Sequence, residues 1–211
     1  MEFAEQKLYE IRQGKDATGL VKVDRAIFEL YDKLQRISGD DKKQYVGIPT
    51  GFSALDSLTT GLNRTDLILL AARPAMGKSS FMMNIASNVA KQGHAVAIFS
   101  LEMSREQLAT RLISSEAFLD NKKLMTGKLS PDDWDKVTLA STALAHTKIY
   151  IDDNPSLSVA DMNAKCRRIE DLGMVVIDYL QLMQSSGSTT RYAGENRQQV
   201  VADISRALKI M

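Results

Sequence analysis

Four short apolar runs recur along the chain, and segments with helical spacing separate them. The runs are LILLA (67–71), AVAIFS (95–100), KIYID (148–152) and MVVID (174–178). A strand that is apolar on both faces must be covered on both faces, as happens when helices flank a parallel sheet. We therefore predict an α/β fold with a mostly parallel sheet between layers of helices.

Apolar residues at three- and four-residue spacing predict the helices. The expected ranges are 2–12, 20–38, 78–91, 104–119, 158–171 and 196 to the last residue, with one more helix opened by Ser130-Pro131. Ser104 and Gln107 have the spacing of a capping box. We divide the chain into a short helical segment (1–14), a helical lead-in (15–45) and an α/β domain (46–211). Because the last predicted helix is still running at Met211, we expect the chain to be part of a longer protein.

The composition excludes several classes of function. The net charge is only +1, so any nucleic-acid surface must be local. A single cysteine, Cys166, rules out an internal disulfide, and with only His94 and His146 beside it we expect no zinc centre. No apolar run approaches the roughly 20 residues that span a bilayer, and the N-terminus lacks the apolar region of a signal peptide. We expect a cytoplasmic protein that stays out of the membrane.

The segment between the first apolar run and the helix at 78–91 has the pattern of a phosphate-binding loop. Such a loop points backbone N–H groups at phosphate oxygens from a helix N-terminus. Lys78 is expected to reach the β- and γ-phosphates, and Ser79 to ligate Mg²⁺. Ala72 stands where glycine is usual, which an ordinary negative φ would permit. The residues predicted to bind nucleotide are Ala72, Arg73, Pro74, Ala75, Met76, Gly77, Lys78, Ser79 and Ser80.

Two carboxylates follow the ends of predicted strands, where α/β sheets place their ligands. Asp178 ends MVVID, and we expect it beside the Mg²⁺. Glu102 follows AVAIFS and is the best-placed general base for a water that attacks the γ-phosphate. Each pattern also has an interpretation without a catalytic role: Asp178 as a simple cap at a strand end, and Glu102 as an ordinary exposed glutamate. Asp152-Asp153 is a rival carboxylate pair, which we interpret as the exit from a strand into a turn.

Longer blocks of sequence carry a resemblance to a known family. The blocks are GIPTGFSALDSLTTGLNRTDLILLAARPAMGKSSF (47–81), AIFSLEMS (97–104), MVVIDYLQLM (174–183) and ENRQQVVADISRALK (195–209). In this order they closely resemble the DnaB family of bacterial replicative DNA helicases, over essentially the whole chain. Alanine at the position of Ala72 is common in that family.

The resemblance implies a RecA-like P-loop ATPase core that assembles into a homo-hexameric ring around single-stranded DNA and unwinds duplex at the replication fork. It implies ATP and Mg²⁺ as cofactors, Lys78 and Ser79 as phosphate and metal ligands, Glu102 as the catalytic glutamate and Asp178 as the aspartate on the Mg²⁺ side. Residues 1–14 resemble the linker helix that docks on a neighbouring subunit. Primase and a helicase loader are the partners implied for the full-length protein.

The same resemblance implies parts that this chain does not contain. The family's N-terminal domain is absent, and its sensor motif and arginine finger lie beyond Met211. Because an arginine finger contributes strongly to the transition state, we expect the 211-residue chain alone to bind nucleotide weakly and hydrolyse it poorly.

Candidate DNA contacts come from two places. Arg191 and Tyr192, in the Gly/Ser/Thr-rich stretch 185–197, and Arg197 at its end offer phosphate contacts and an aromatic platform. Lys165, Arg167 and Arg168 form a basic cluster on a predicted helix, with Arg167 and Arg168 as the candidate contacts. The plain readings are a solvated connector and a solvated helix face. Two other functions stay open: a RecA-type recombination or repair ATPase, and a nucleotide-binding ring component without productive hydrolysis.

Overall fold

The computed structural model describes residues 21–38, 47–179 and 197–211, which belong to two units, Met1–Val46 and Gly47–Met211. The predicted helix 2–12 and the segment 1–14 lie outside the described residues. The described part of the first unit, residues 21–38, contains one helix. That helix, α2 (Val23–Ser38), confirms the helix predicted from about residue 20. Ile27, Leu30 and Leu34 of this helix are exposed.

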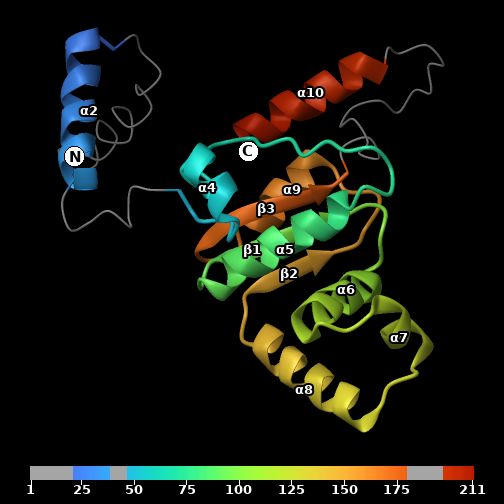
Figure 1. Cartoon of the computed structure of the whole chain (residues 1–211). Coiled ribbons are helices and arrows are strands. Elements are labelled where there is room, and N and C mark those ends of the chain that lie inside the picture. Colours follow the sequence, from blue (N-terminus) through green and yellow to red (C-terminus); the bar gives the residue numbers. More distant parts are fainter. Residues whose placement is uncertain (1–20, 39–46, 180–196) are drawn as a thin grey trace, which may run out of the picture. The chain divides into compact units, whose positions relative to one another are not determined.

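The second unit is built on a parallel sheet (Figure 1). Its described strands are β1 (Ala95–Ser100), β2 (Ile149–Asp152) and β3 (Leu172–Asp178), in the order β2-β1-β3. β1 pairs in parallel with both neighbours, and Ser100 is level with Asp178. Because the strands are parallel, the loops that follow them leave from the same edge of the sheet. The predicted α/β class is confirmed.

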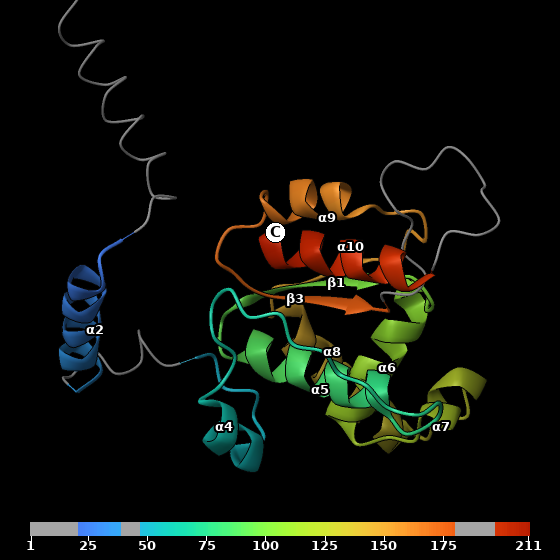
Figure 2. The same cartoon turned by 90° about the horizontal axis from the view of Figure 1, so that it is seen from above.

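Helices cover both faces of this sheet. Val96 and Ile98 of β1 pack against α5 (Lys78–Lys91) and α6 (Arg105–Ala117), whereas Ala97 and Phe99 pack against α9 (Val159–Cys166) and α10 (Arg197–Ile210). Figure 2 shows α9 and α10 on one side of the strands and α5 and α6 on the other. β1 is therefore buried on both faces, as its unbroken apolar sequence predicts.

The remaining helices are α4 (Ser53–Thr59), α7 (Asn121–Thr126) and α8 (Pro131–Ala145). The helix opened by Ser130-Pro131 is confirmed as α8, and so is the capping box of Ser104 and Gln107 at the start of α6. α4 and α7 were not predicted, because helices of six or seven residues give too few turns for a period to show. In the described ranges, no helix is both long and apolar enough to cross a bilayer.

The strand predicted at 67–71 is wrong for this structure. These residues have no regular secondary structure, and the side chains of Leu67, Ile68, Leu69 and Leu70 are 38–67% exposed. Their backbone groups form no backbone hydrogen bond within the described residues. Apolar side chains favour burial, but a strand exists only when its backbone pairs with another strand. The apolar run alone does not supply that partner.

The end of α9 also differs from the prediction. The helix stops at Cys166 instead of continuing to residue 171. Arg168 N–H and Ile169 N–H donate to carbonyls three residues back, which tightens the chain into turns. Asp171 then has a positive φ of 54°, which ends any helical course before β3 begins.

Candidate nucleotide-binding site

The predicted phosphate loop is an exposed turn that leads directly into α5. Met76 N–H donates to the carbonyl of Arg73 at 3.3 Å, and Ala75 and Gly77 both have positive φ, 63° and 85°. Ala72 is not among the described non-glycine residues with positive φ, so its backbone is ordinary. This is the condition under which alanine replaces glycine at this position. Within the described residues, the N–H groups of Lys78, Ser79 and Ser80 at the start of α5 donate to no backbone carbonyl, as anion binding requires.

Three side chains from the loop and the sheet meet at the start of α5. The Lys78 ammonium lies 2.7 Å from Oδ1 of Asp178, and the Ser79 hydroxyl donates to Oδ2 at 2.9 Å. Asp178 ends β3 and is 1% exposed, so its charge is held away from water. Lys78 and Asp178 are 100 positions apart in the sequence, and the fold brings them into contact.

This group of side chains has the chemistry that a magnesium–nucleotide pair requires. A carboxylate and a hydroxyl are the hard oxygen ligands that Mg²⁺ prefers. A lysine at the start of a helix adds a positive charge to the N–H groups that face a phosphate. The residues present therefore fit both groups, with Asp178 and Ser79 on the metal side and Lys78 on the phosphate side.

Tyr179 belongs to this cluster, although the sequence analysis did not single it out. The Lys78 ammonium lies 4.8 Å from the centre of the Tyr179 ring, within the range of a cation–π contact. Only the position of Tyr179 directly after Asp178 pointed toward the site, and the ring contact depends on the fold.

Glu102 lies two residues past the end of β1, on the edge of the sheet from which Asp178 emerges. Its side chain is exposed, and within the described residues its carboxylate has no hydrogen bond or ion pair. Within the part of the chain that the structure describes, no contact occupies this carboxylate, as suits a group that accepts a proton. Its placement at the carboxyl edge agrees with the position expected of a general base.

The rival pair of carboxylates is engaged in other contacts. Asp153 binds the backbone and guanidinium of Arg105, and Asp152 pairs with Lys165. The side-chain hydrogen bond from Arg105 is the largest effect that lowers the pKa of Asp153, and the same contact raises the pKa of Arg105. A carboxylate held in such a pair is a poor proton acceptor, so the interpretation of a strand exit suits the structure better than that of a base.

The block GIPTGF (47–52) is hydrogen-bonded to α5. The backbone N–H and hydroxyl of Thr50 donate to Asp56 at 2.8 and 2.7 Å, and Thr50 is 1% exposed. The side-chain amide of Asn88 donates to the Thr50 carbonyl at 3.0 Å. These contacts hold α5, the helix that begins with Lys78 and Ser79, near its carboxyl end.

The basic residues predicted to contact DNA are not gathered at this site. Arg167 and Arg168 are exposed and follow the end of α9, in the connection that enters the amino end of β3. They are thus not on a helix face, because α9 ends at Cys166. Arg197 begins α10, whereas Arg191 and Tyr192 lie outside the described residues.

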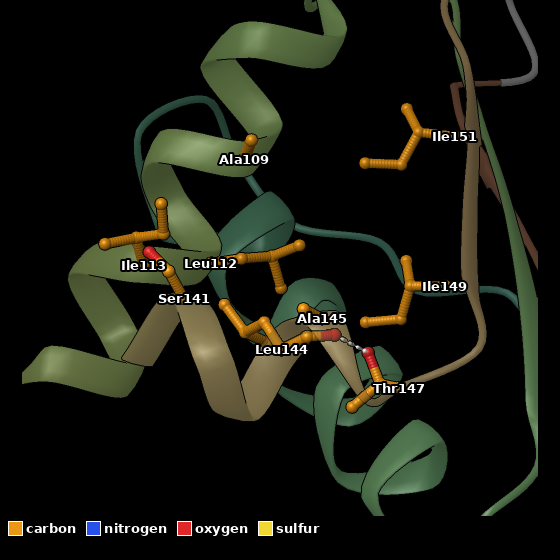
Figure 3. Close-up of a pocket in the computed structure, with 9 residues that line it drawn as sticks. All are labelled: Ala109, Leu112, Ile113, Ser141, Leu144, Ala145, Thr147, Ile149 and Ile151. Carbon is orange, nitrogen blue, oxygen red and sulfur yellow. Dashed lines mark hydrogen bonds between the residues drawn. The ribbon is translucent and has the colours of Figure 1, made fainter. Parts of the chain in front are cut away.

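An apolar cavity of about 250 Å³ lies elsewhere, between α6, α8 and β2 (Figure 3). In Figure 3, Ile149 and Ile151 of β2 face Leu112 of α6 and Leu144 of α8. The Thr147 hydroxyl in its wall already donates to the Leu144 carbonyl at 2.6 Å. The walls offer no charged group for a phosphate, so this cavity is not the nucleotide site.

Comparison with known proteins agrees with this geometry. Residues 47–211 match the family described as DnaB-like helicase C terminal domain. The chain is 47% identical to the replicative DNA helicase DnaB of Geobacillus stearothermophilus and 44% identical to the replicative DNA helicase DnaC of Bacillus subtilis. Those alignments cover 99% and 98% of this chain but only 46% and 45% of the relatives. The chain thus spans about half the length of the curated relatives it matches.

Solved structures give the same result. One is the structure of a DnaB-like replicative helicase and its interactions with primase. It superposes on this chain with a TM-score of 0.78 at 29% identity. It covers 100% of this chain and 50% of that one. An isolated ATPase domain gives a TM-score of 0.77, again at 29% identity. The chain belongs to the family of DnaB-like helicase C-terminal domains.

Proposed function

We propose that this chain is the motor domain of an ATP-dependent replicative DNA helicase, which translocates on single-stranded DNA and unwinds duplex at the replication fork. The observation that carries the proposal is the convergence of Lys78, Ser79 and Asp178 at the start of α5, in a member of the DnaB-like family. The fold alone would not distinguish a helicase from another ATPase.

In the proposed reaction, Lys78 and the N–H groups at the start of α5 hold the phosphates of ATP. Mg²⁺, held by Ser79 and Asp178, would neutralise charge on the phosphate oxygens. Glu102 accepts a proton from the water that attacks the γ-phosphate, since it follows the neighbouring strand and has no hydrogen bond or ion pair within the described residues. Arg73 and Ser80 flank the phosphate-binding groups in the loop.

The proposal extends to assembly. We propose that the full-length protein forms a homo-hexamer in the cytoplasm, that residues 1–14 dock on a neighbouring subunit, and that primase and a loader bind the ring. Relatives named as replicative helicases and a related helicase described with primase support this view. Arg167, Arg168, Arg191, Tyr192 and Arg197 remain the proposed DNA contacts.

The test is unwinding of a forked DNA substrate by the full-length protein, with ATP and Mg²⁺. We expect ATP-dependent strand separation that Lys78→Ala abolishes through lost nucleotide binding, and that Glu102→Gln abolishes while nucleotide still binds. ATP hydrolysis without unwinding, together with joint-molecule formation, would favour a recombination ATPase. Nucleotide binding without hydrolysis by the complete ring would overturn the proposal in favour of a non-hydrolysing ring component.

A further inference from the structure

Glu102 lies in the short segment 100–105, and one buried hydroxyl bridges the two ends of its first turn, from residue 100 to residue 103. Ser100, the last residue of β1, is 1% exposed. Its hydroxyl donates to the Met103 carbonyl at 2.7 Å and accepts from the Met103 N–H at 3.0 Å. One side chain thus holds both backbone groups of the residue after Glu102, and it fixes the path of the loop between 100 and 103.

A second contact, between Asp153 and Arg105, holds the segment just beyond Glu102. Oδ2 of Asp153 accepts from the backbone N–H of Arg105 at 3.0 Å, and Oδ1 lies 2.8 Å from the Arg105 guanidinium. Asp153 follows the end of β2, the strand on the other side of β1 from Asp178. The first residue of α6 is therefore held to the sheet by a two-point contact.

A third contact ties the same segment to β3. The backbone N–H of Leu101 donates to the Asp178 carbonyl at 2.8 Å, and the Leu101 side chain is buried. The segment 100–105 is consequently fixed before and after Glu102, while the Glu102 side chain itself is exposed and unbonded within the described part of the chain. Within the described residues, the Glu102 carboxylate is thus an exposed group on a segment whose backbone is held on both sides of it.

We propose that Ser100 and Asp153 are positioning residues for Glu102: they hold its backbone at the edge of the sheet where β3 ends in Asp178. The inference rests on the proposed function, in which Glu102 accepts the proton of the attacking water. A glutamate side chain that gets no support from contacts of its own depends on its backbone for placement. Misplacement of a reacting group by about 1 Å costs on the order of 100-fold in rate.

The experiment measures ATP hydrolysis by the full-length protein as kcat and KM, with nucleotide affinity measured separately. We expect Ser100→Ala and Asp153→Ala each to lower kcat by about 10- to 100-fold. KM and the Kd for MgADP should change by less than about twofold, because neither residue contacts the phosphate loop. Asp153→Asn, which keeps an acceptor for the Arg105 N–H, should restore part of the kcat.

Asp152 supplies the matched control. It precedes Asp153 in the chain and forms an ion pair of the same kind, but with Lys165 on α9 and not with the segment that carries Glu102. Asp152→Ala should therefore leave kcat within about twofold of the unchanged protein. If Asp152→Ala and Asp153→Ala reduce kcat equally, the loss reflects a general loosening of the sheet edge, and the inference is wrong.

A double-variant cycle separates positioning from general stability. If Ser100 acts through Glu102, adding Ser100→Ala to Glu102→Gln should leave the residual rate unchanged in single-turnover measurements. A further tenfold drop would overturn the inference. Retained hydrolysis in Glu102→Gln alone would instead overturn the proposed role of Glu102. Normal kcat in Ser100→Ala and Asp153→Ala, with loss in Glu102→Gln, would remove the positioning role and leave the proposed function standing.

Discussion

The Lys78 ammonium lies 2.7 Å from the carboxylate of Asp178, and this ion pair joins the phosphate loop to the end of β3. The aspartate side chain is almost fully buried, whereas the lysine side chain is 28% exposed. The pair thus gives Lys78 two roles, one toward phosphate and one toward the stability of the sheet. The two roles can be separated, because stability is measurable without nucleotide.

Lys78→Met should lower the free energy of unfolding by about 2–4 kcal/mol, since it removes the ion-pair partner of a buried carboxylate and leaves it, among the described side chains, with the Ser79 hydroxyl. Urea titration followed by circular dichroism measures this. Lys91→Met is the matched control on the same helix: it breaks the pair with Glu116, in which the lysine is 42% exposed, and should cost at most about 1 kcal/mol. Equal losses in the two variants would show that the Lys78 pair contributes no more than a surface pair.

Asp133 predicts a pH dependence of stability. The backbone N–H of Ser130 is the largest effect that lowers the pKa of this carboxyl, and Lys123 lowers it further. A carboxyl whose pKa is lower in the folded state stabilises the protein above its unfolded pKa of about 3.9. That contribution is lost as the pH falls through this value toward the folded pKa.

Asp133→Asn should therefore lower the free energy of unfolding at pH 7, with a smaller loss at pH 3. Asp132→Asn is the control, because Asp132 is exposed and pairs only with Lys136 one turn away. Its effect should stay near 0.5 kcal/mol or below. The prediction is wrong if both variants show the same change between pH 7 and pH 3.

Gly51 of the GIPTGF block should resist replacement for two separate reasons, its backbone conformation and a side chain packed against it. It has a φ of +84°, and a Cβ there would lie 2.3 Å from the side-chain nitrogen of Asn88. Gly51→Ala should break the bond from Asn88 to Thr50 and lower the melting temperature by more than strain alone. Gly127→Ala gives the strain alone, about 1 kcal/mol, since its φ is +67° and a Cβ there meets nothing. Calorimetry of both variants decides, and equal shifts would contradict the proposed steric conflict.

Cys166 reports on the packing of α10. It is buried with Ile204 and Leu208 of that helix, and burial raises the pKa of its thiol. The native protein should thus react with a thiol reagent far more slowly than the unfolded chain does. Leu208→Ala should speed the reaction, whereas Ile210→Ala, at an exposed position on the same helix, should not. Fast labelling of the unchanged protein would show that α10 leaves this face.

The sequence signals that succeeded were local ones. Ser104 and Gln107 predict a capping box from three residues of spacing, and the box is present. The run AVAIFS predicts a buried strand over its full length, and β1 has those bounds. Such features depend on the chain within one turn or one strand, so a single sequence is sufficient to find them.

The failures share a physical cause, because each depends on what a segment meets after folding. LILLA is as apolar as AVAIFS, but no strand of the described residues pairs with it. Ser100, Asp153 and Tyr179 carry no motif, and they matter only because three strand ends lie side by side. The sequence marks Asp153 as a carboxylate at a strand exit, but its partner Arg105 lies 48 residues earlier in the chain, so the pattern gives no sign of their contact.

Arg167 and Arg168 give the sharpest test of the DNA surface. They are exposed, and they lie in the connection that leads to the amino end of β3, whereas Glu102 and Asp178 follow the carboxyl ends of β1 and β3. A double change to alanine can therefore alter DNA binding without disturbing the candidate nucleotide site. If both side chains contact phosphates, the plot of log affinity against log salt should become shallower by about 1–2.

Binding of single-stranded DNA by the full-length ring, measured by fluorescence anisotropy at several salt concentrations, tests this expectation. MgADP affinity is the internal control and should not change. Lys22→Ala with Arg25→Ala is a matched control, since these exposed cations already pair with Asp24 and Glu29 and were not predicted to meet DNA. If the Arg167 and Arg168 variant keeps the affinity and the salt slope of the unchanged ring, both residues belong to a solvated surface. The proposed DNA contacts would then reduce to Arg191, Tyr192 and Arg197.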